Sequence, residues 1–409
     1  MRKVTFTAAC LLLSSMYAWR TGRTFVASRL AERVSLGSLE TAVRLEPTNA
    51  EYHARLGRYR LFDQQEVNSA TREFTAATTL NPYVARYWLD SASAYLVQGD
   101  AQRIHQVLSH ALELDPQTPD VAWAAAIFEL TQGNTEGSLR DFRTVVANDA
   151  SMAVPALRLC WRATHDVDRI LQLSVPARAD SYLALMQVLI ERNEPDAAAI
   201  LWTRLKQLRQ SFDPQLAFGY VQFLIDARRA TAARVTWEDL VGLNQKLRPY
   251  AASADNLVVN GGFDEDVLNE GLDWRYQSVP GAEITLDSST FHDGRRALHV
   301  TYQNASVQDS GVFQYVPLQP NTTYELSWFS RTDNMNGASG PRLYVADAYT
   351  RDVLLLTEDL RGAPAWQSHK TRFQTGNQTE VIVLGITRQP AMPKLAGNLW
   401  IDDVRLQKR

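Results

Sequence analysis

The chain has 409 residues, of which 45% are hydrophobic and 21% charged, a balance typical of globular protein rather than of a largely disordered chain. Its formal net charge of −3 lacks the basic excess of a nucleic-acid-binding protein, so no nucleic-acid partner is expected. With only two cysteines, neither a disulfide framework nor a four-cysteine zinc site can form.

Residues 1–34 are predicted to be a signal anchor with a juxtamembrane segment. Arg2 and Lys3 precede an apolar run from Val4 to Trp19, a pattern typical of a secretory signal. Because a clean small-x-small cleavage site is missing, we expect the segment to remain as a membrane anchor, with the rest of the chain outside the cytoplasm, in the periplasm or at the cell surface. Cleavage would make the protein secreted. The alternative is a buried helix, since apolar runs of this length also form core helices.

A repeat begins soon after this segment. Leu45-Glu46-Pro47, Leu80-Asn81-Pro82 and Leu114-Asp115-Pro116 recur, with prolines at 47, 82 and 116, so that the steps are 35 and 34 residues. Gln98-Gly99-Asp100 and Gln132-Gly133-Asn134 follow the same period. The Gly-Asp and Gly-Asn dipeptides are typical of a turn inside each repeat unit. Each proline is typical of the end of a helical hairpin, because it cannot continue the preceding helix.

Small and aromatic residues take recurring places in two successive units: Ala70, Phe74, Ala77 and Pro82, then Trp88, Ala92, Tyr95, Ala111 and Pro116. This pattern resembles the tetratricopeptide repeat, a helix–turn–helix of about 34 residues. The resemblance covers residues 35–248. It implies an all-α solenoid whose concave surface binds a protein partner, with the recurring aromatics in the core.

Helical periodicity stops near residue 249, and the small, polar stretch 249–254 is predicted to be a linker. Short runs rich in β-branched and aromatic residues then alternate with turn signals. The predicted strands are Glu283–Leu286, Ala297–Tyr302, Gly311–Leu318, Thr323–Arg331, Arg342–Asp347, Gln367–Thr375, Glu380–Thr387 and Gly397–Leu406. About eight short strands over residues 255–409 predict an all-β sandwich.

Four motifs in order give this segment a second resemblance: Asn256–Glu265, Gly294–Val300, Leu318–Tyr324 and Leu399–Leu406. Together they resemble the carbohydrate-binding modules attached to xylanases and cellulases, which are jelly rolls of galactose-binding-like topology. The fold class is therefore a multidomain α plus β chain, an N-terminal TPR-like solenoid followed by a jelly-roll sandwich. The resemblance implies that the sandwich binds a glycan.

In that family a structural calcium ion often ties the opening segment to the last strand. Carried over by position, the candidate ligands are Asp264, Glu265, Asp402 and Asp403, and carboxylate oxygens suit this hard cation. The alternative is that Asp402 and Asp403 only end a strand or keep its edge soluble.

Sugar binding calls for exposed aromatic faces with polar side chains beside them. Strand alternation places Trp328 on the core side, so this tryptophan is not a candidate. The better candidates for a carbohydrate-binding face are Tyr344, Tyr349, Arg342 and Arg388.

Motifs for catalysis are missing from the sequence. It has neither a Gly-x-Ser-x-Gly elbow nor a phosphate-binding glycine loop, and His105 and His110 are five residues apart rather than the four of a helical zinc pair. We expect no catalytic residues and predict an exported adaptor that joins a protein partner to a glycan, with cell-surface polysaccharide export or assembly as the setting. The second hypothesis is a protein-binding scaffold with a purely structural sandwich, and the third is a glycan-active enzyme.

Overall fold

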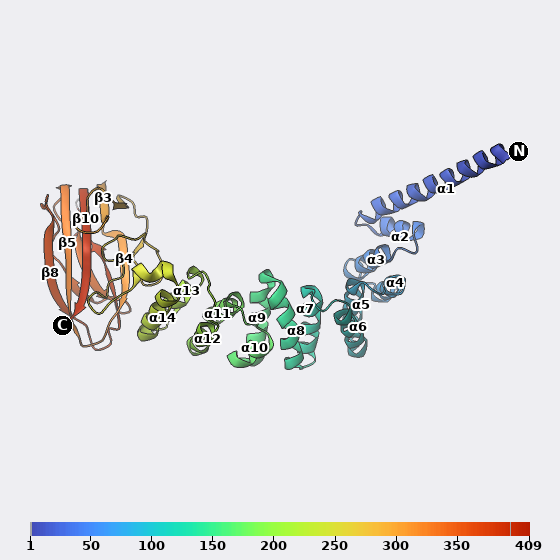
Figure 1. The fold of residues 1–409 in the computed structure, drawn as a ribbon, viewed down its shortest axis with the longest axis horizontal. Helices are drawn as coiled ribbons and strands as arrows, with labels where there is room; N and C mark the ends of the chain where they lie inside the picture. The colour runs from blue at the N-terminus through green and yellow to red at the C-terminus, as the bar shows by residue number, and fades with distance from the viewer. Residues whose placement is uncertain (1, 393) are drawn as a thin grey trace. The chain divides into compact units, whose positions relative to one another are not determined.

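The computed structural model of the chain describes residues 2–392 and 394–409, and side chains from Leu11 onward. The chain divides into two compact units, residues 1–188 and residues 189–409. The first unit is helical, and the second has further helices followed by two β-sheets (Figure 1). The predicted order, an all-α solenoid followed by an all-β sandwich, is confirmed.

Successive helices of the first unit pack as antiparallel hairpins, with α3 against α4, α5 against α6 and α7 against α8. The helices are α1 (Arg2–Ala31), α2 (Leu36–Leu45), α3 (Ala50–Phe62), α4 (Val67–Leu80), α5 (Ala85–Gln98), α6 (Ala101–Leu114), α7 (Pro119–Thr131), α8 (Thr135–Asn148), α9 (Ala150–Thr164), α10 (Val167–Leu173) and α11 (Ala179–Glu191), which crosses into the second unit. Helices and turns follow the period seen in the sequence.

The turn inside a repeat needs a left-handed residue and a cap. Gly99 and Gly133 have φ angles of 72° and 77°, which glycine adopts without a steric penalty. Asp100 and Asn134 then accept hydrogen bonds from backbone N–H groups in the first turns of α6 and α8. The Gly-Asp and Gly-Asn pairs of the sequence therefore end one helix and start the next.

Small residues let the helices of a hairpin approach closely. The ring of Phe74 on α4 lies against Gly57 on α3, where an added Cβ would be 2.5 Å from the ring. Ala70 and Ala77, one turn to either side of Phe74, are fully buried. The apolar contacts form several small clusters along the unit, as expected where each repeat packs mainly on its neighbours.

Helix α1 carries the predicted anchor. Its described apolar side chains are largely exposed: Leu11, Leu12, Leu13, Met16, Tyr17 and Trp19. Within the described part of the chain, no helix combines the length and the apolar character needed to cross a membrane. The side chains of residues 1–10, where the predicted anchor begins, lie outside the described ones.

The second unit begins with α12 (Pro195–Gln207), α13 (Gln215–Asp226), α14 (Ala230–Leu243) and the 3₁₀ helix η1 (Gln245–Tyr250). These helices pack on the sandwich through Trp237 and Tyr250, which are both buried. The Trp237 Nε1–H donates to the Tyr250 carbonyl (3.0 Å), and the Tyr250 hydroxyl donates to the Asp266 carbonyl (2.7 Å). The predicted linker 249–254 thus contains a buried residue, Tyr250, and the linker boundaries stay a prediction.

Two antiparallel sheets of five strands form the sandwich, in the orders β1-β4-β9-β6-β7 and β2-β3-β10-β5-β8. We call them the β9 sheet and the β10 sheet after their central strands. The strands are β1 (Arg275–Tyr276), β2 (Ala282–Asp287), β3 (Ala297–Ala305), β4 (Asp309–Pro317), β5 (Thr323–Asn336), β6 (Arg342–Asp347), β7 (Val353–Leu356), β8 (Gln367–Gln374), β9 (Val381–Thr387) and β10 (Leu395–Lys408). All eight predicted strands are present, and the short β1 and β7 were not predicted.

The core lies between the sheets and follows strand alternation. On β9, Ile382, Leu384 and Ile386 point into it, and on β5 Leu326 and Trp328 do the same. The prediction that Trp328 belongs to the core is therefore confirmed. Every second residue along the strands of the β9 sheet faces away from the core. These outward-facing residues form one of the candidate sites described below.

Candidate functional site

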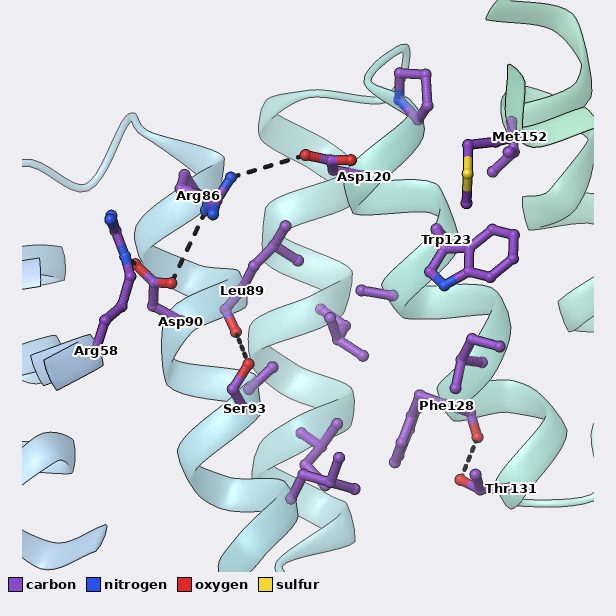
Figure 2. Close-up of a pocket in the computed structure, with 18 of the residues that line it drawn as sticks. Arg58, Arg86, Leu89, Asp90, Ser93, Asp120, Trp123, Phe128, Thr131 and Met152 are labelled. Carbon is purple, nitrogen blue, oxygen red and sulfur yellow. Dashed lines mark hydrogen bonds and ion pairs between the residues drawn. The ribbon is translucent and has the colours of Figure 1, made fainter. Parts of the chain in front are cut away.

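The first candidate site is a groove of about 460 Å³ in the helical unit, lined mainly by α5 and α7 (Figure 2). Its wall is largely apolar, with Leu89 and Leu96 on α5, Trp123 and Phe128 on α7, and Met152 on α9. Leu89 and Leu96 are seven positions apart, about two helical turns, and Trp123 and Phe128 are five positions apart. The sequence predicted a concave binding surface, but it did not single out these residues.

One end of the groove is charged. The Arg58 Nε–H donates to Asp90 (2.9 Å), and Arg86 lies 3.9 Å from Asp90 and 3.7 Å from Asp120 (Figure 2). Burial raises the pKa of Asp90, and the charge of Arg58 opposes this rise. The groove therefore offers an apolar wall next to a charged end, an arrangement suited to a peptide with apolar side chains.

The second candidate site is the outward side of the β9 sheet, which we call the outer face. Strand register aligns its residues in rows that cross the strands. The middle row consists of Phe313, Gly385, Tyr344 and Leu356. The row on one side consists of Tyr315, Val383 and Ala346. The row on the other side consists of Asp309, Thr387 and Arg342.

Aromatic rings line the middle of the outer face. An added Cβ on Gly385 would lie 2.8 Å from the Tyr344 ring, so the ring rests directly over this glycine. The Phe313 and Tyr315 rings stand edge-on to each other with centroids 5.6 Å apart. Burial raises the pKa of Tyr344 to about 12. The sequence predicted Tyr344 but missed Phe313 and Tyr315, although their alternation with core residues on β4 was a usable signal.

Of the four predicted sugar-binding residues, Tyr344 and Arg342 lie together on the outer face. Arg342 Nε is 2.7 Å from Asp359, and its Nη1–H donates to the Thr357 carbonyl (3.2 Å). The guanidinium is thus held at the edge of the face next to a carboxylate. Such a fixed pair of donor and acceptor groups can orient sugar hydroxyls.

The other two residues make internal contacts. Arg388 is only 1% exposed and donates to the carbonyls of Ser339 and Ala391, so it ties two loops together. The Tyr349 hydroxyl donates to the Ile225 carbonyl of α13 at 2.9 Å. Neither residue shares a row with Tyr344, and their sugar-binding role stays a prediction.

The outward side of the β10 sheet also has aromatic residues, but their faces are covered. The Trp400 ring stacks on His299 with centroids 4.4 Å apart, and the Arg331 guanidinium lies 5.5 Å from its ring centroid. The Trp400 Nε1–H donates to Asp287 (2.8 Å). With both its ring and its N–H engaged, Trp400 is less suited to receive a sugar than Tyr344.

The predicted calcium ligands were tested by the contacts they make. Asp402 is fully buried, and its two carboxylate oxygens accept backbone N–H groups from His292 (2.7 Å), Asp293 (3.1 Å) and Asp403 (2.7 Å). Burial raises the pKa of Asp402, and these donors oppose the rise. These N–H donors take up three of the acceptor sites that Asp402 could otherwise offer to a cation.

The remaining predicted ligands pair with donors or arginines. Asp264 accepts the Arg295 backbone N–H (2.5 Å), Glu265 pairs with the Arg295 guanidinium (3.0 Å), and Asp403 pairs with Arg405 (2.7 Å). Among the described residues, no three His, Cys, Asp or Glu side chains are grouped to hold a metal ion. As they lie, these residues do not fit a calcium site.

Direct hydrogen bonds make the connection that the ion was expected to make. The Leu257 N–H donates to the Leu406 carbonyl (2.9 Å), and the Val404 N–H donates to the Gly261 carbonyl (2.8 Å). Position 261 needs glycine, because an added Cβ would lie 2.1 Å from the Val404 carbonyl oxygen. The opening segment is therefore joined to β10 by its own backbone.

Comparison with known proteins found one family model and several solved structures that match parts of the chain. The model of a family described as "Carbohydrate binding domain" matches residues 255–391 and confirms the predicted resemblance of this segment. No curated protein matches the chain. A xylan-binding domain from Paenibacillus barcinonensis is 12% identical with a TM-score of 0.27, and the match covers 39% of this chain and 97% of that domain.

Two other solved structures match the helical part. The pilF protein of Pseudomonas aeruginosa is 14% identical with a TM-score of 0.29, over 55% of this chain and 94% of that one. A tetratricopeptide repeat protein from Parabacteroides merdae is 13% identical with a TM-score of 0.31, over 54% of this chain and 93% of that one.

Proposed function

We propose that this chain is an adaptor that binds a protein partner in the groove of its helical repeats and a glycan on the outer face of its sandwich, without covalent chemistry. The observation that carries the proposal is the row of Phe313, Gly385 and Tyr344 on a module that matches a carbohydrate-binding family. The other hypotheses, a protein-binding scaffold and a glycan-active enzyme, are outcomes of the tests below.

Glycan binding on the outer face is supported by its shape and chemistry. The apolar side of a pyranose packs on an aromatic ring, and Tyr344 and Phe313 each keep part of their ring exposed. Gly385 between them has no side chain, so the Tyr344 ring can lie over it on the outer face. Arg342 and Asp359 at the edge can bind sugar hydroxyls as donor and acceptor.

Protein binding is supported by the groove of the helical unit. Leu96 on α5 and Phe62 at the end of α3 are 61% and 65% exposed although both are large and apolar. Apolar side chains at the rim of a concave surface gain free energy when a partner covers them, by about 25 cal/mol for each Å² removed from water.

We place the protein outside the cytoplasm, attached to a membrane by its first residues, in the export or assembly of a cell-surface polysaccharide. The exposed apolar side chains of α1 support an attachment, because such a helix is stabilised when lipid covers it. Membrane fractionation tests this: the full chain should sediment with membranes after an alkaline wash, and a variant that begins at Thr24 should not. Equal sedimentation of the two would contradict the attachment.

A glycan array tests the sugar-binding part with the full chain. We expect retention on at least one glycan, lost in Tyr344→Ala and Phe313→Ala but kept in Tyr83→Ala, which removes an exposed tyrosine from the helical unit. A folded chain that no glycan retains would favour the scaffold with a structural sandwich. Cleavage of an arrayed glycan would favour the enzyme.

Site-specific photo-crosslinking tests the protein-binding part. A photoreactive residue at Leu96, in the groove, should form a crosslink to a partner protein in cells. The same residue at Gln106, an exposed position on α6, should not. The crosslink at position 96 should disappear when Trp123 is replaced by Asp; a crosslink that persists in that variant would exclude the groove as the binding surface.

A further inference from the structure

One corner of the outer face is built by the helices that precede the sandwich. Helix α14 contacts β4, and the Tyr349 hydroxyl donates to the last turn of α13 through the Ile225 carbonyl (2.9 Å). The Arg228 guanidinium lies over the Tyr349 ring, with its central carbon 4.8 Å from the ring centroid. The turn between α13 and α14, residues 227–229, is thus fixed against the sandwich.

Arg228 occupies a backbone position that does not favour arginine. Its φ is 57°, in the left-handed region, and the corresponding turns of earlier repeats have Gln65, Gly99, Gly133, His165 and Asn193 there. A side chain with a Cβ costs about 1 kcal/mol or more in this region relative to glycine. The contact with Tyr349 offsets this cost, and the left-handed residue of the last turn is also the one that reaches the sandwich.

Arg275 closes the β1 end of the same corner. Its guanidinium lies 5.0 Å from the Tyr315 ring centroid, and its Nη2–H donates to the Gly271 carbonyl (3.0 Å). Gly271 in turn abuts the ring of Trp237 on α14. Burial lowers the pKa of Arg275, while the charge of Asp226 at the end of α13 opposes that change.

Exposure differs from strand to strand across the outer face. Val383 and Ala346, which share a row with Tyr315, are only 4% and 6% exposed although they point away from the core. At the far end of the middle row, Leu356 on β7 is 37% exposed. The outer face is therefore least exposed along β9 and most exposed at β7.

We infer that the α13–α14 turn, with Arg228, forms an end wall of the glycan-binding face, so that the face receives the end of a glycan chain rather than a stretch inside one. A chain that lies across the strands meets Arg275 at β1, and one that lies along the strands meets Tyr349 and Arg228. This inference rests on the proposed glycan binding, which it makes more specific.

The test compares long and short forms of the same glycan at equal mass. Soluble xylan, mixed-linkage β-glucan and alginate are the probes, each before and after mild acid cleavage to short fragments, with the full chain immobilised. If chain ends bind, the amount of complex per unit mass should rise in proportion to the number of ends. Retention that does not change on cleavage overturns the end wall alone. Failure of all three probes in both forms overturns the proposed glycan binding and the inference with it.

Arg228→Gly tests the wall itself, because glycine suits the left-handed turn and the variant should fold. We expect about a three- to tenfold loss of the preference for cleaved over intact probe, because the turn loses the cation–π contact that holds it against Tyr349. Asn193→Gly is the matched control, because it places glycine at the corresponding left-handed position one repeat earlier. This variant should keep the preference for cleaved over intact probe. Arg228→Lys should restore part of it. An equal loss for both forms of the probe would assign Arg228 a merely structural role and contradict the inference.

Discussion

At the scale of single residues, Asp273 is the most unusual acid of the sandwich. It is fully buried, one oxygen accepts the Leu268 N–H (2.8 Å), and burial raises its pKa to about 7. An acid whose pKa is raised on folding holds its proton longer in the folded state than in the unfolded state. It therefore removes stability as the pH rises from its unfolded value of about 4 towards 7.

Asp273→Asn keeps an acceptor for Leu268 but cannot ionise. Relative to the parent chain, the free energy of unfolding of this variant should rise by about 1.4 kcal/mol for each pH unit between pH 4 and pH 7. Urea unfolding at several pH values, monitored by tryptophan fluorescence, measures it. A difference between the two chains that stays constant over this range would show that Asp273 does not titrate as described.

Asp402 poses a different question, because it was predicted to bind calcium. Since its oxygens accept three backbone N–H groups, Asp402→Asn should lower the free energy of unfolding by about 1–3 kcal/mol, with calcium or chelator present. Asp403→Asn is the control and should cost less, as its carboxylate pairs with the half-exposed Arg405. A melting temperature that calcium raises in the parent chain but not in Asp402→Asn would contradict this assignment.

At the scale of elements, two glycines in helices allow a matched comparison. Gly57→Ala on α3 would push a methyl group into the Phe74 ring and should destabilise the chain by about 1–3 kcal/mol. Gly219→Ala on α13 meets open space and should stabilise its helix by about 0.5–1 kcal/mol. Thermal unfolding followed by circular dichroism measures both, and equal effects would contradict the close helix packing assigned to Gly57.

The junction between α14 and the sandwich is also a matter of elements. Trp237→Ala should open a cavity against Gly271 and leave the Tyr250 carbonyl without its donor, at a cost of about 3–5 kcal/mol. Hydrogen exchange should then speed up in residues 266–276 of the sandwich as well as in α14. Trp161→Ala, an equally buried change in the first unit, should leave that segment unchanged. Unchanged exchange in residues 266–276 of Trp237→Ala would show that the sandwich does not depend on the helices.

At the scale of the whole molecule, the sequence predicted the architecture well because it is set by local, repeating signals. The turns and helices recur with a 34-residue period, and alternation in strands such as β5 is visible within a few residues. The short β1 and β7 were missed, since two- and four-residue strands carry too little alternation to detect.

The candidate site was only partly predictable, because its residues come together through strand register and tertiary packing. Tyr344 and Arg342 follow from alternation along β6, but Phe313 joins them only through pairing with β9. Tyr349 and Arg388 are polar residues next to strands, as binding residues often are, yet their partners Ile225 and Ser339 are distant in sequence. No local pattern could have revealed those contacts.

The most direct measurement of the central claim is a hydrogen-exchange footprint of the full chain with and without a saturating glycan. Binding on the outer face should slow exchange in β4, β6 and β9, and leave the groove of the helical unit and the strands of the β10 sheet unchanged. Slowed exchange confined to β3, β5 and β10, or to α5 and α7, would place the glycan elsewhere and contradict the account.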